Sequence, residues 1–264
     1  MGALSIVLVP GAAALPGVYQ PFVDAVTKHG FDIHALHLPS VGLENGEAKP
    51  GPPPTLQDDA AHVAQHVARL ADAGRDVLLV THSYGGAAGT ESVQGLSKAS
   101  RRERGLEGGI VRIAYITSLV PALGQSPGSM LAALPAENQI ANEVDENGWI
   151  LFKDLDRIAE VSFNHFPPEE GKYWAAKLVK HSGASFMSPL TYAGYKDVPV
   201  SYLFCEADRV IPPFVQQGEI DMIEEETGKK VDVTRIDSDH VPLVSHPDLM
   251  IDWVVKLAKA ESDA

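Results

Sequence analysis

Short apolar runs alternate with stretches of helical periodicity along most of the chain. Continuous runs rich in β-branched residues predict buried strands at residues 4–9, 31–38, 76–81, 110–118, 199–205 and 230–236. Apolar residues with a period near 3.6 predict helices at residues 18–29, 56–72, 84–98, 213–227 and 244–260. Strands that are apolar on both faces and separated by helices indicate a mostly parallel sheet with helices on both faces. The predicted fold class is therefore α/β.

Local signals support two of these assignments. The Pro-rich stretch at 50–54 predicts a stiff surface loop, and Thr55 fits the N-cap of the helix that follows. The apolar run at 4–9 resembles part of a signal peptide, but no basic residue precedes it, and it ends in Pro10-Gly11 rather than a small-residue cleavage site. We predict that this run is a buried strand.

Residues 122–190 interrupt the alternation. No clear strand is predicted there, and short helical stretches are predicted at 130–135, 155–162 and 169–181. The segment carries seven of the 18 aromatic residues of the chain. An apolar insertion after a sheet strand predicts a cap over the mouth of an active site, within one domain that spans residues 1–264. The alternative is a helical subdomain whose aromatic side chains pack only on one another.

Composition narrows the class of partner. The net charge of −14 argues against nucleic acid and against anionic membrane surfaces as partners, and no apolar run of 20 residues predicts a membrane span. The single cysteine, Cys205, excludes internal disulfides and fits a reducing, cytoplasmic location. Because it lies in an apolar run, we interpret it as a small buried hydrophobe rather than a reactive thiol. Nothing in the sequence indicates an oligomeric state.

The strongest local motif is the segment Asp-Val-Leu-Leu-Val-Thr-His-Ser-Tyr-Gly-Gly-Ala-Ala-Gly at 76–89. A buried strand runs directly into Ser83, two glycines follow, and a helix of small residues departs. This strand–turn–helix order is typical of a nucleophile elbow, in which a strained turn exposes a serine hydroxyl. Thr81 stands where the usual pattern has its first glycine, so the turn must accommodate a β-branched residue.

A serine nucleophile needs a base, and the base needs an orienting acid. In this architecture the order along the chain is serine, acid, histidine, and each partner follows a strand. Asp208 follows the strand at 199–205 and His240 follows the strand at 230–236, so we predict a Ser83–His240–Asp208 triad. Glu206 is the alternative acid, although it lies closer to the strand.

Other acidic residues and histidines near these loops are predicted to have structural rather than catalytic roles. Asp237 and Asp239 are predicted to form turns. His246 precedes a proline at the start of the last helix, and we prefer His240 as the base. His82, beside the candidate nucleophile, is predicted to pack rather than to react.

Two histidine pairs suggest a metal site. His62 and His66 are four residues apart on a helix, and His34 and His37 lie near a strand end. No Glu follows His62 as a His-Glu-x-x-His motif requires, and the chain has no cysteine cluster. We therefore expect neither a metal nor another cofactor.

The reaction also needs donors for an oxyanion. The backbone N–H of Tyr84, directly after the candidate nucleophile, is one. The loop after the first strand supplies the other, and we assign it to the N–H of Ala12 because the small residues there allow close backbone approach to a substrate.

Together, the segments Val-Pro-Gly at 9–11, Thr-His-Ser-Tyr-Gly-Gly at 81–86, Cys-Glu-Ala-Asp-Arg-Val-Ile-Pro-Pro at 205–213 and Asp-Ser-Asp-His-Val-Pro-Leu-Val-Ser-His-Pro at 237–247 resemble the α/β-hydrolase superfamily. Within it, the chain looks like the compact branch of methyl-ester hydrolases and hydroxynitrile lyases, and still more like microbial and fungal members. The resemblance spans nearly the whole chain and implies the same triad and oxyanion donors.

The chain also departs from that branch. Lyase members have a lysine directly after the catalytic histidine and a threonine near the oxyanion strand, whereas this chain has Val241 and Gly11 at those places. Pro10 replaces a histidine that is common in the first loop. The resemblance therefore implies ester chemistry better than cyanohydrin cleavage, and Ser83 excludes the aspartate nucleophile of dehalogenases and epoxide hydrolases.

Three functions follow from these observations. We expect first a hydrolase of a small hydrophobic carboxylic ester or lactone, with a non-hydrolytic lyase or other triad enzyme of secondary metabolism and a ligand-sensing receptor as alternatives. The candidate contacts to a neutral, hydrophobic substrate are apolar side chains of the cap: Trp149, Phe152, Phe163, Phe166, Trp174, Phe186 and Met187.

Overall fold

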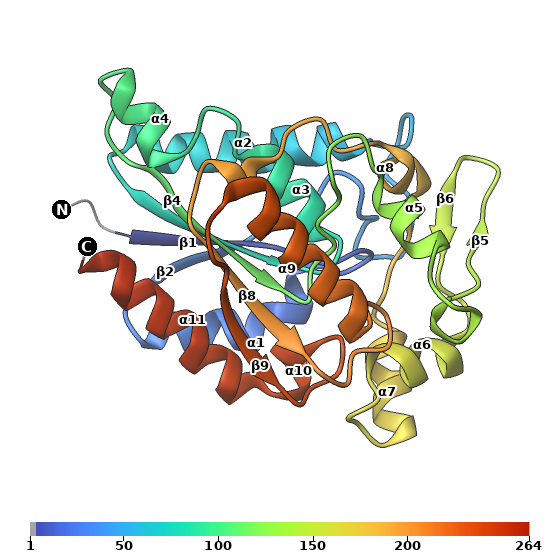
Figure 1. Cartoon of the computed structure of the whole chain (residues 1–264). Coiled ribbons are helices and arrows are strands. Elements are labelled where there is room, and N and C mark those ends of the chain that lie inside the picture. Colours follow the sequence, from blue (N-terminus) through green and yellow to red (C-terminus); the bar gives the residue numbers. More distant parts are fainter. Residues whose placement is uncertain (1–3, 264) are drawn as a thin grey trace.

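A six-stranded parallel sheet runs through the middle of the protein (Figure 1). The computed structural model describes residues 4–263. The strand order across the sheet is β2-β1-β3-β4-β8-β9, and every neighbouring pair is parallel. The strands are β1 (Leu4–Val9), β2 (Asp32–Ala35), β3 (Asp76–His82), β4 (Gly109–Ile116), β8 (Val200–Cys205) and β9 (Asp232–Ile236). The predicted α/β class is confirmed.

Helices cover both faces of this sheet. The helices α1 (Gln20–Lys28) and α11 (Pro247–Ser262) lie on one face (Figure 1). The helices α2 (Leu56–Asp72), α3 (Gly85–Ser92) and α9 (Pro213–Thr227) pack on the other. Shorter turns of helix complete this part of the chain: η1 (Pro16–Tyr19), α4 (Lys98–Glu103), η3 (Gly194–Lys196) and α10 (Pro242–Ser245).

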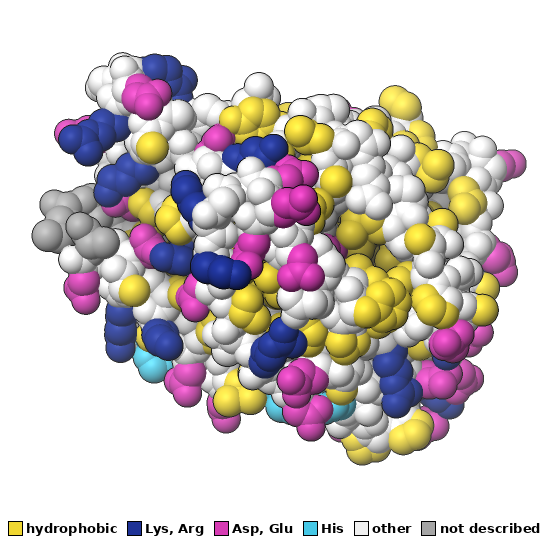
Figure 2. Space-filling model, in the orientation of Figure 1, with side chains coloured by type: hydrophobic (Ala, Val, Ile, Leu, Met, Phe, Trp, Pro, Cys, Tyr) yellow, Lys and Arg dark blue, Asp and Glu magenta, His cyan; other side chains and the backbone are white. Residues whose placement is uncertain are grey.

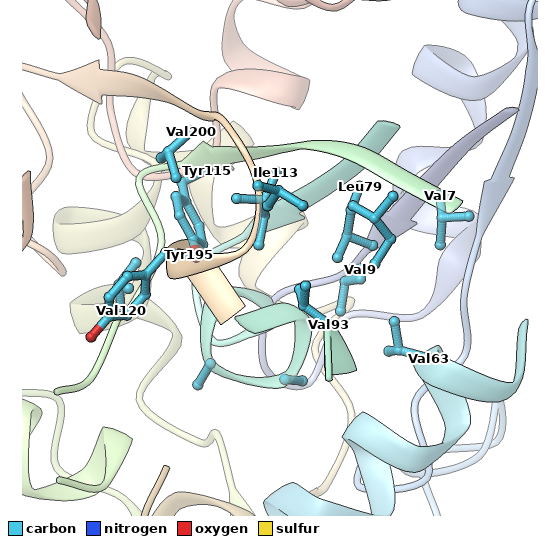
Figure 3. Close-up of a cluster of buried hydrophobic side chains, with 14 of the residues drawn as sticks. Val7, Val9, Val63, Leu79, Val93, Ile113, Tyr115, Val120, Tyr195 and Val200 are labelled. Atoms are coloured by element: carbon cyan, nitrogen blue, oxygen red, sulfur yellow. The ribbon is translucent and has the colours of Figure 1, made fainter. Parts of the chain in front are cut away.

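Two hydrophobic cores result from the alternation of side chains along the strands. Val7, Leu79 and Ile113 are register partners on three neighbouring strands and point to the same face. Figure 3 shows them on that face with Val63 of α2. Residues at alternate positions, such as Leu8, belong to the second core under α1 and α11. Because both faces are buried, the strands read in the sequence as continuous apolar runs.

Most predicted boundaries differ from the observed ones for local reasons. The prediction for α2 was correct to the residue, since Thr55 and Asp58 form a reciprocal capping box at its start. The helix predicted at 84–98 was too long: α3 ends at Ser92, and Gly95 follows with a φ of 71°. The last helix is interrupted at His246, because a residue before a proline disfavours the helical backbone.

The cap segment, residues 122–190, lies at the carboxyl ends of the strands, away from both termini (Figure 1). It contains the helices α5 (Pro127–Ala132), η2 (Ala136–Asn138), α6 (Leu155–Ser162), α7 (Pro168–Ala175) and α8 (Gly183–Met187). The expectation that it holds no strand was wrong. The strands β5 (Glu143–Val144), β6 (Trp149–Leu151) and β7 (His181–Ser182) form a small antiparallel sheet. Strands this short carry too few residues for a readable two-residue period.

No helix in the described part of the chain, residues 4–263, is both long and apolar enough to cross a membrane.

Candidate active site

Ser83 lies in a strained turn between β3 and α3. Its φ is 53°, a left-handed value that only glycine adopts without cost. A Cβ on Gly85 would overlap the carbonyl oxygen of Val9 and lie 2.6 Å from that of Pro10, so the turn packs directly against the end of β1. Glycine at this position therefore lets Ser83 stand above the sheet edge, as a nucleophile elbow requires.

The structure brings Ser83, His240 and Asp208 together. His240 Nε2 lies 2.9 Å from Ser83 Oγ, and His240 Nδ1 lies 2.8 Å from Asp208 Oδ2. All three side chains are buried, with exposed fractions of 8%, 6% and 2% for the serine, histidine and aspartate. With Nδ1–H donating to the carboxylate, Nε2 is left to accept the serine proton.

Asp208 is held by more than the histidine. Its Oδ1 accepts hydrogen bonds from the backbone N–H groups of Val210, at 2.7 Å, and Ile211, at 2.9 Å. Its Oδ2 also accepts from the hydroxyl of Thr117, directly after β4. These bonds stabilise the charged carboxylate and orient it toward His240. Sequence reasoning missed Thr117, because no local pattern marks a hydroxyl that acts on a loop 91 positions away.

The alternative acid and base lie elsewhere. Glu206 is exposed. The half-buried His246 places its Nδ1 at 2.9 Å from the Ser238 hydroxyl and 3.1 Å from the Ser245 hydroxyl, rather than at Ser83. Asp239 forms a turn, as predicted, accepting from the backbone N–H of Val241 at 3.1 Å and from the Ser245 hydroxyl at 2.6 Å.

The two predicted oxyanion donors belong to residues that line the same cavity as Ser83. Ala12 and Tyr84 both line it, and within residues 4–263 neither amide donates a hydrogen bond to a protein acceptor. Ala13, the next residue along, has a φ of 60°. Its N–H donates to His181 Nδ1 at 3.1 Å, and its carbonyl accepts from Val179 at 3.0 Å. The end of the cap segment therefore holds the loop that carries Ala12.

The cavity measures about 350 Å³ and lies between the strand ends and the cap. Among the described residues that line it, none is Lys, Arg, Asp or Glu. Four of the seven predicted substrate contacts line it: Phe152, Phe163, Trp174 and Phe186. Figure 2 shows hydrophobic side chains gathered between α9 and the cap elements. The geometry suits a neutral, apolar ligand whose reacting carbonyl reaches Ser83.

Trp149, Phe166 and Met187 do not line the cavity, which corrects the sequence prediction. Trp149 is 1% exposed, and its neighbour Ile150 lines the cavity with Phe152 instead. Successive residues of an extended chain point to opposite faces. Ile150 and Phe152 therefore share the face toward the cavity, and Trp149 lies on the other face. Phe166 packs beside Trp174 at 6.5 Å between ring centroids, and Met187 is 73% exposed.

The remaining histidines form no metal site in the described part of the chain. The rings of His34 and His66 lie 5.0 Å apart at their centroids, but nowhere within residues 4–263 do three or more His, Cys, Asp or Glu side chains group around a possible ion. Cys205 is buried, and burial raises the pKa of its thiol, which disfavours the reactive thiolate.

Known proteins resemble this chain over nearly its whole length. A model of the alpha/beta hydrolase family matches residues 6–253. The chain belongs to the alpha/beta hydrolase family. It is 33% identical over 253 residues to "Probable hydrolase R7" of Phoma sp., which covers 96% of this chain and 97% of that protein. It is 29% identical to "Alpha/beta hydrolase nvfD" of Aspergillus novofumigatus, over 94% of this chain and 93% of that protein.

Two solved structures of other proteins are similar to this chain over almost its whole length. A pyrethroid hydrolase from Sphingobium faniae JZ-2 superposes with a TM-score of 0.71 at 20% identity, covering 99% of this chain and 100% of that one. Polyneuridine aldehyde esterase superposes with a TM-score of 0.71 at 16% identity, covering 98% and 100% of the two chains. At these identities the likeness establishes the α/β-hydrolase fold.

Proposed function

We propose that this α/β hydrolase cleaves small, hydrophobic carboxylic esters or lactones with Ser83 as its nucleophile. The observation that carries the proposal is the set of contacts from Ser83 through His240 to Asp208, at 2.9 and 2.8 Å, opening into an uncharged cavity. A serine hydroxyl becomes a competent nucleophile only beside a base of this kind. The fungal relative at 33% identity is described as a probable hydrolase, which agrees with this class of reaction.

In the proposed first step, Ser83 Oγ bonds to the ester carbonyl carbon while its proton passes to His240 Nε2. The carbonyl oxygen becomes an oxyanion that accepts hydrogen bonds from the N–H groups of Ala12 and Tyr84. Asp208 stabilises the imidazolium without taking its proton. His240 then donates that proton to the departing alkoxide, and the C–O bond breaks to leave an acyl-enzyme.

In the second step, His240 removes a proton from water, whose oxygen attacks the acyl carbon. The same two N–H groups stabilise the second oxyanion, and the proton returns from His240 to Ser83 Oγ as the acid departs. With a lactone the alcohol and the acid stay in one product. The lining of Leu131, Ile140 and Phe152 favours an acyl or alcohol group without charge.

Val241 lines the cavity at the place where lyases of similar fold carry a lysine. An aliphatic side chain there offers no charge to hold a departing cyanide. The described site therefore favours ester hydrolysis over cyanohydrin cleavage.

Turnover of a p-nitrophenyl ester series from acetate to hexanoate tests the proposal. We expect release of p-nitrophenol by the wild type, a single fluorophosphonate adduct on Ser83, and neither event in Ser83→Ala. Tight binding of the esters with no turnover and no adduct would favour the receptor alternative. Turnover retained in Ser83→Ala above a tenth of the wild-type rate would contradict the mechanism.

A further inference from the structure

A buried chain of hydrogen bonds joins the loop of the oxyanion donor to the backbone of the candidate base. The N–H of Gly11 donates to Tyr19 Oη at 3.2 Å. Tyr19 Oη lies 2.9 Å from His82 Nδ1, and His82 Nε2 lies 2.8 Å from the carbonyl oxygen of His240. Tyr19 and His82 are 1% and 3% exposed. We call these four residues the Gly11–His240 chain.

The chemistry of its two ends, together with a neutral His82 ring, determines the direction of every bond. An amide N–H can only donate, so the Tyr19 oxygen accepts from Gly11. A carbonyl can only accept, so His82 Nε2 must carry a proton toward His240. When the ring is neutral and its proton is on Nε2, Nδ1 carries no proton and accepts from the Tyr19 hydroxyl, so all three bonds form together. Burial, and then the nearby His240, lower the pKa of His82 to about 3, which keeps the ring neutral.

All four members of the chain line the cavity that Ser83 also lines. Gly11 precedes Ala12, which lines the cavity and carries a proposed oxyanion donor. His82 precedes Ser83, and the ring of His82 lies 5.2 Å from the ring of His240. The last acceptor is the carbonyl of His240 itself. The chain thus touches three separate loops at the positions where displacement would misplace the oxyanion donor, the nucleophile or the base.

Packing alone does not explain the hydroxyl of Tyr19. A phenylalanine would fill the same apolar space beside the second core, whereas a buried hydroxyl is costly unless it is hydrogen-bonded. Removing it would also leave the Gly11 N–H and His82 Nδ1 without partners.

We propose that Tyr19 and His82 are positioning residues that hold the loops of Ala12 and His240 at a fixed separation around Ser83. This inference rests on the proposed function, because it assigns the purpose of the chain to ester hydrolysis. The Gly11–His240 chain should lower the energy of the transition state more than that of bound substrate. Only in the transition state do the oxyanion near Ala12 and the imidazolium of His240 form together, so only then must the two loops be held at the correct separation.

The test compares Tyr19→Phe with Tyr115→Phe. Tyr115 is also fully buried, and its hydroxyl bonds to Thr90 at 2.7 Å in the core on the other face of the sheet. The active-site concentration of each variant is measured by fluorophosphonate titration of Ser83, so that a smaller folded fraction does not lower the calculated kcat. We expect kcat of Tyr19→Phe to fall roughly 10- to 100-fold with KM nearly unchanged, and kcat of Tyr115→Phe to stay within about twofold.

A transition-state analogue and two variants of His82 separate positioning from packing. A trifluoromethyl ketone that forms a hemiketal with Ser83 should bind Tyr19→Phe more weakly by the same factor as the loss in kcat/KM. His82→Gln keeps an N–H donor for the His240 carbonyl, so it should retain more activity than His82→Phe. Equal loss in both His82 variants, or unchanged ketone affinity in Tyr19→Phe, would overturn the assignment.

Nitrogen-15 NMR of the imidazole rings tests the chain without any turnover. The His82 signals, identified by their loss in His82→Gln, should show a neutral Nε2–H tautomer down to pH 5 and should shift in Tyr19→Phe. An Nδ1–H tautomer or protonation near pH 6.5 would refute the chain. If the wild type neither turns over esters nor takes the label, the proposed function fails, and these spectra still decide whether the chain exists.

Discussion

Thr81 and Gly89 share one small space on the two sides of the nucleophile elbow. A Cβ built on Gly89 would lie 2.5 Å from Cγ2 of Thr81, well inside van der Waals contact. The Thr81 hydroxyl lies 2.9 Å from Ser118 Oγ, so the threonine cannot turn its methyl group away without losing this bond. The β-branched residue at the first glycine position of the usual motif is accommodated because a glycine stands eight residues later, one turn into α3.

Gly89→Ala should therefore destabilise the protein by roughly 1–3 kcal/mol, although alanine is the better helix former. Thr81→Ser removes only the methyl group, keeps the hydroxyl, and should restore most of that stability in the double variant. Denaturant unfolding of the four proteins measures the coupling. Additive changes, with no recovery in Thr81→Ser/Gly89→Ala, would show that the two residues do not compete for space.

Asp208→Asn should lower kcat/KM by about 10⁴, because an amide favours the wrong tautomer of His240. Glu206→Gln is the matched control: it makes the same chemical change two residues away, on an exposed side chain, and should leave the rate within about twofold. Ester turnover by both variants at pH 7 gives the comparison. Similar losses in the two would mean that the loop, rather than the Asp208–His240 contact, governs the rate.

Ser83→Ala and His240→Ala should each lower kcat by roughly 10⁴- to 10⁶-fold, and the double variant should lose little more, because the residues act as a unit. His246→Ala is the control, since its Nδ1 bonds to Ser238 rather than to the site. Single-turnover kinetics resolve the residual rates. A double variant that multiplied the two single losses would indicate independent roles.

Phe152→Ala and Trp149→Ala should separate a substrate contact from a packing residue. Phe152 lines the cavity, so its truncation should raise KM for both esters. The factor of increase should be about ten times larger for p-nitrophenyl hexanoate than for the acetate. Trp149 is buried away from the cavity, and its loss should cost roughly 3–5 kcal/mol of stability with unchanged chain-length preference. Exposed Met187→Ala should change neither property. Thermal melts beside the ester series decide between these outcomes.

Glu219 should make stability depend on pH. Burial raises the pKa of this carboxyl from 4.5 to about 8, despite hydrogen bonds from the Val120 N–H and the Tyr202 hydroxyl. The folded state therefore binds the proton more tightly than the unfolded state, and stability falls as pH rises from about 4.5 to 8. The full effect is at most about 5 kcal/mol.

Glu219→Gln removes this titration. Its amide can donate to Tyr202, whose hydroxyl then turns to the Ser118 carbonyl at 3.2 Å. Relative to the wild type, the variant should gain stability between pH 5 and pH 8, as measured by urea unfolding at each pH. A parallel pH dependence of the two proteins would show that Glu219 ionises normally.

The sequence by itself determined the fold class and the loops that carry the candidate chemistry. Strands buried on both faces must be apolar throughout, so 4–9, 76–81 and 199–205 could be read without contacts. The elbow is equally local, since a strand, a serine and two glycines in succession impose the turn. Asp208 and His240 followed from a topological rule, because the carboxyl ends of parallel strands share one edge of the sheet.

Only the tertiary structure decided which side chains meet at that edge. The choice of Asp208 over Glu206 depends on amides of Val210 and Ile211 that hold one carboxylate toward His240. The face of β6 that lines the cavity was set by pairing with β5 and β7, since a three-residue strand has no period of its own. The hydrogen bonds of Tyr19 and His82 join loops 63 positions apart, and such contacts leave no pattern along the chain because each partner alone resembles an ordinary core residue.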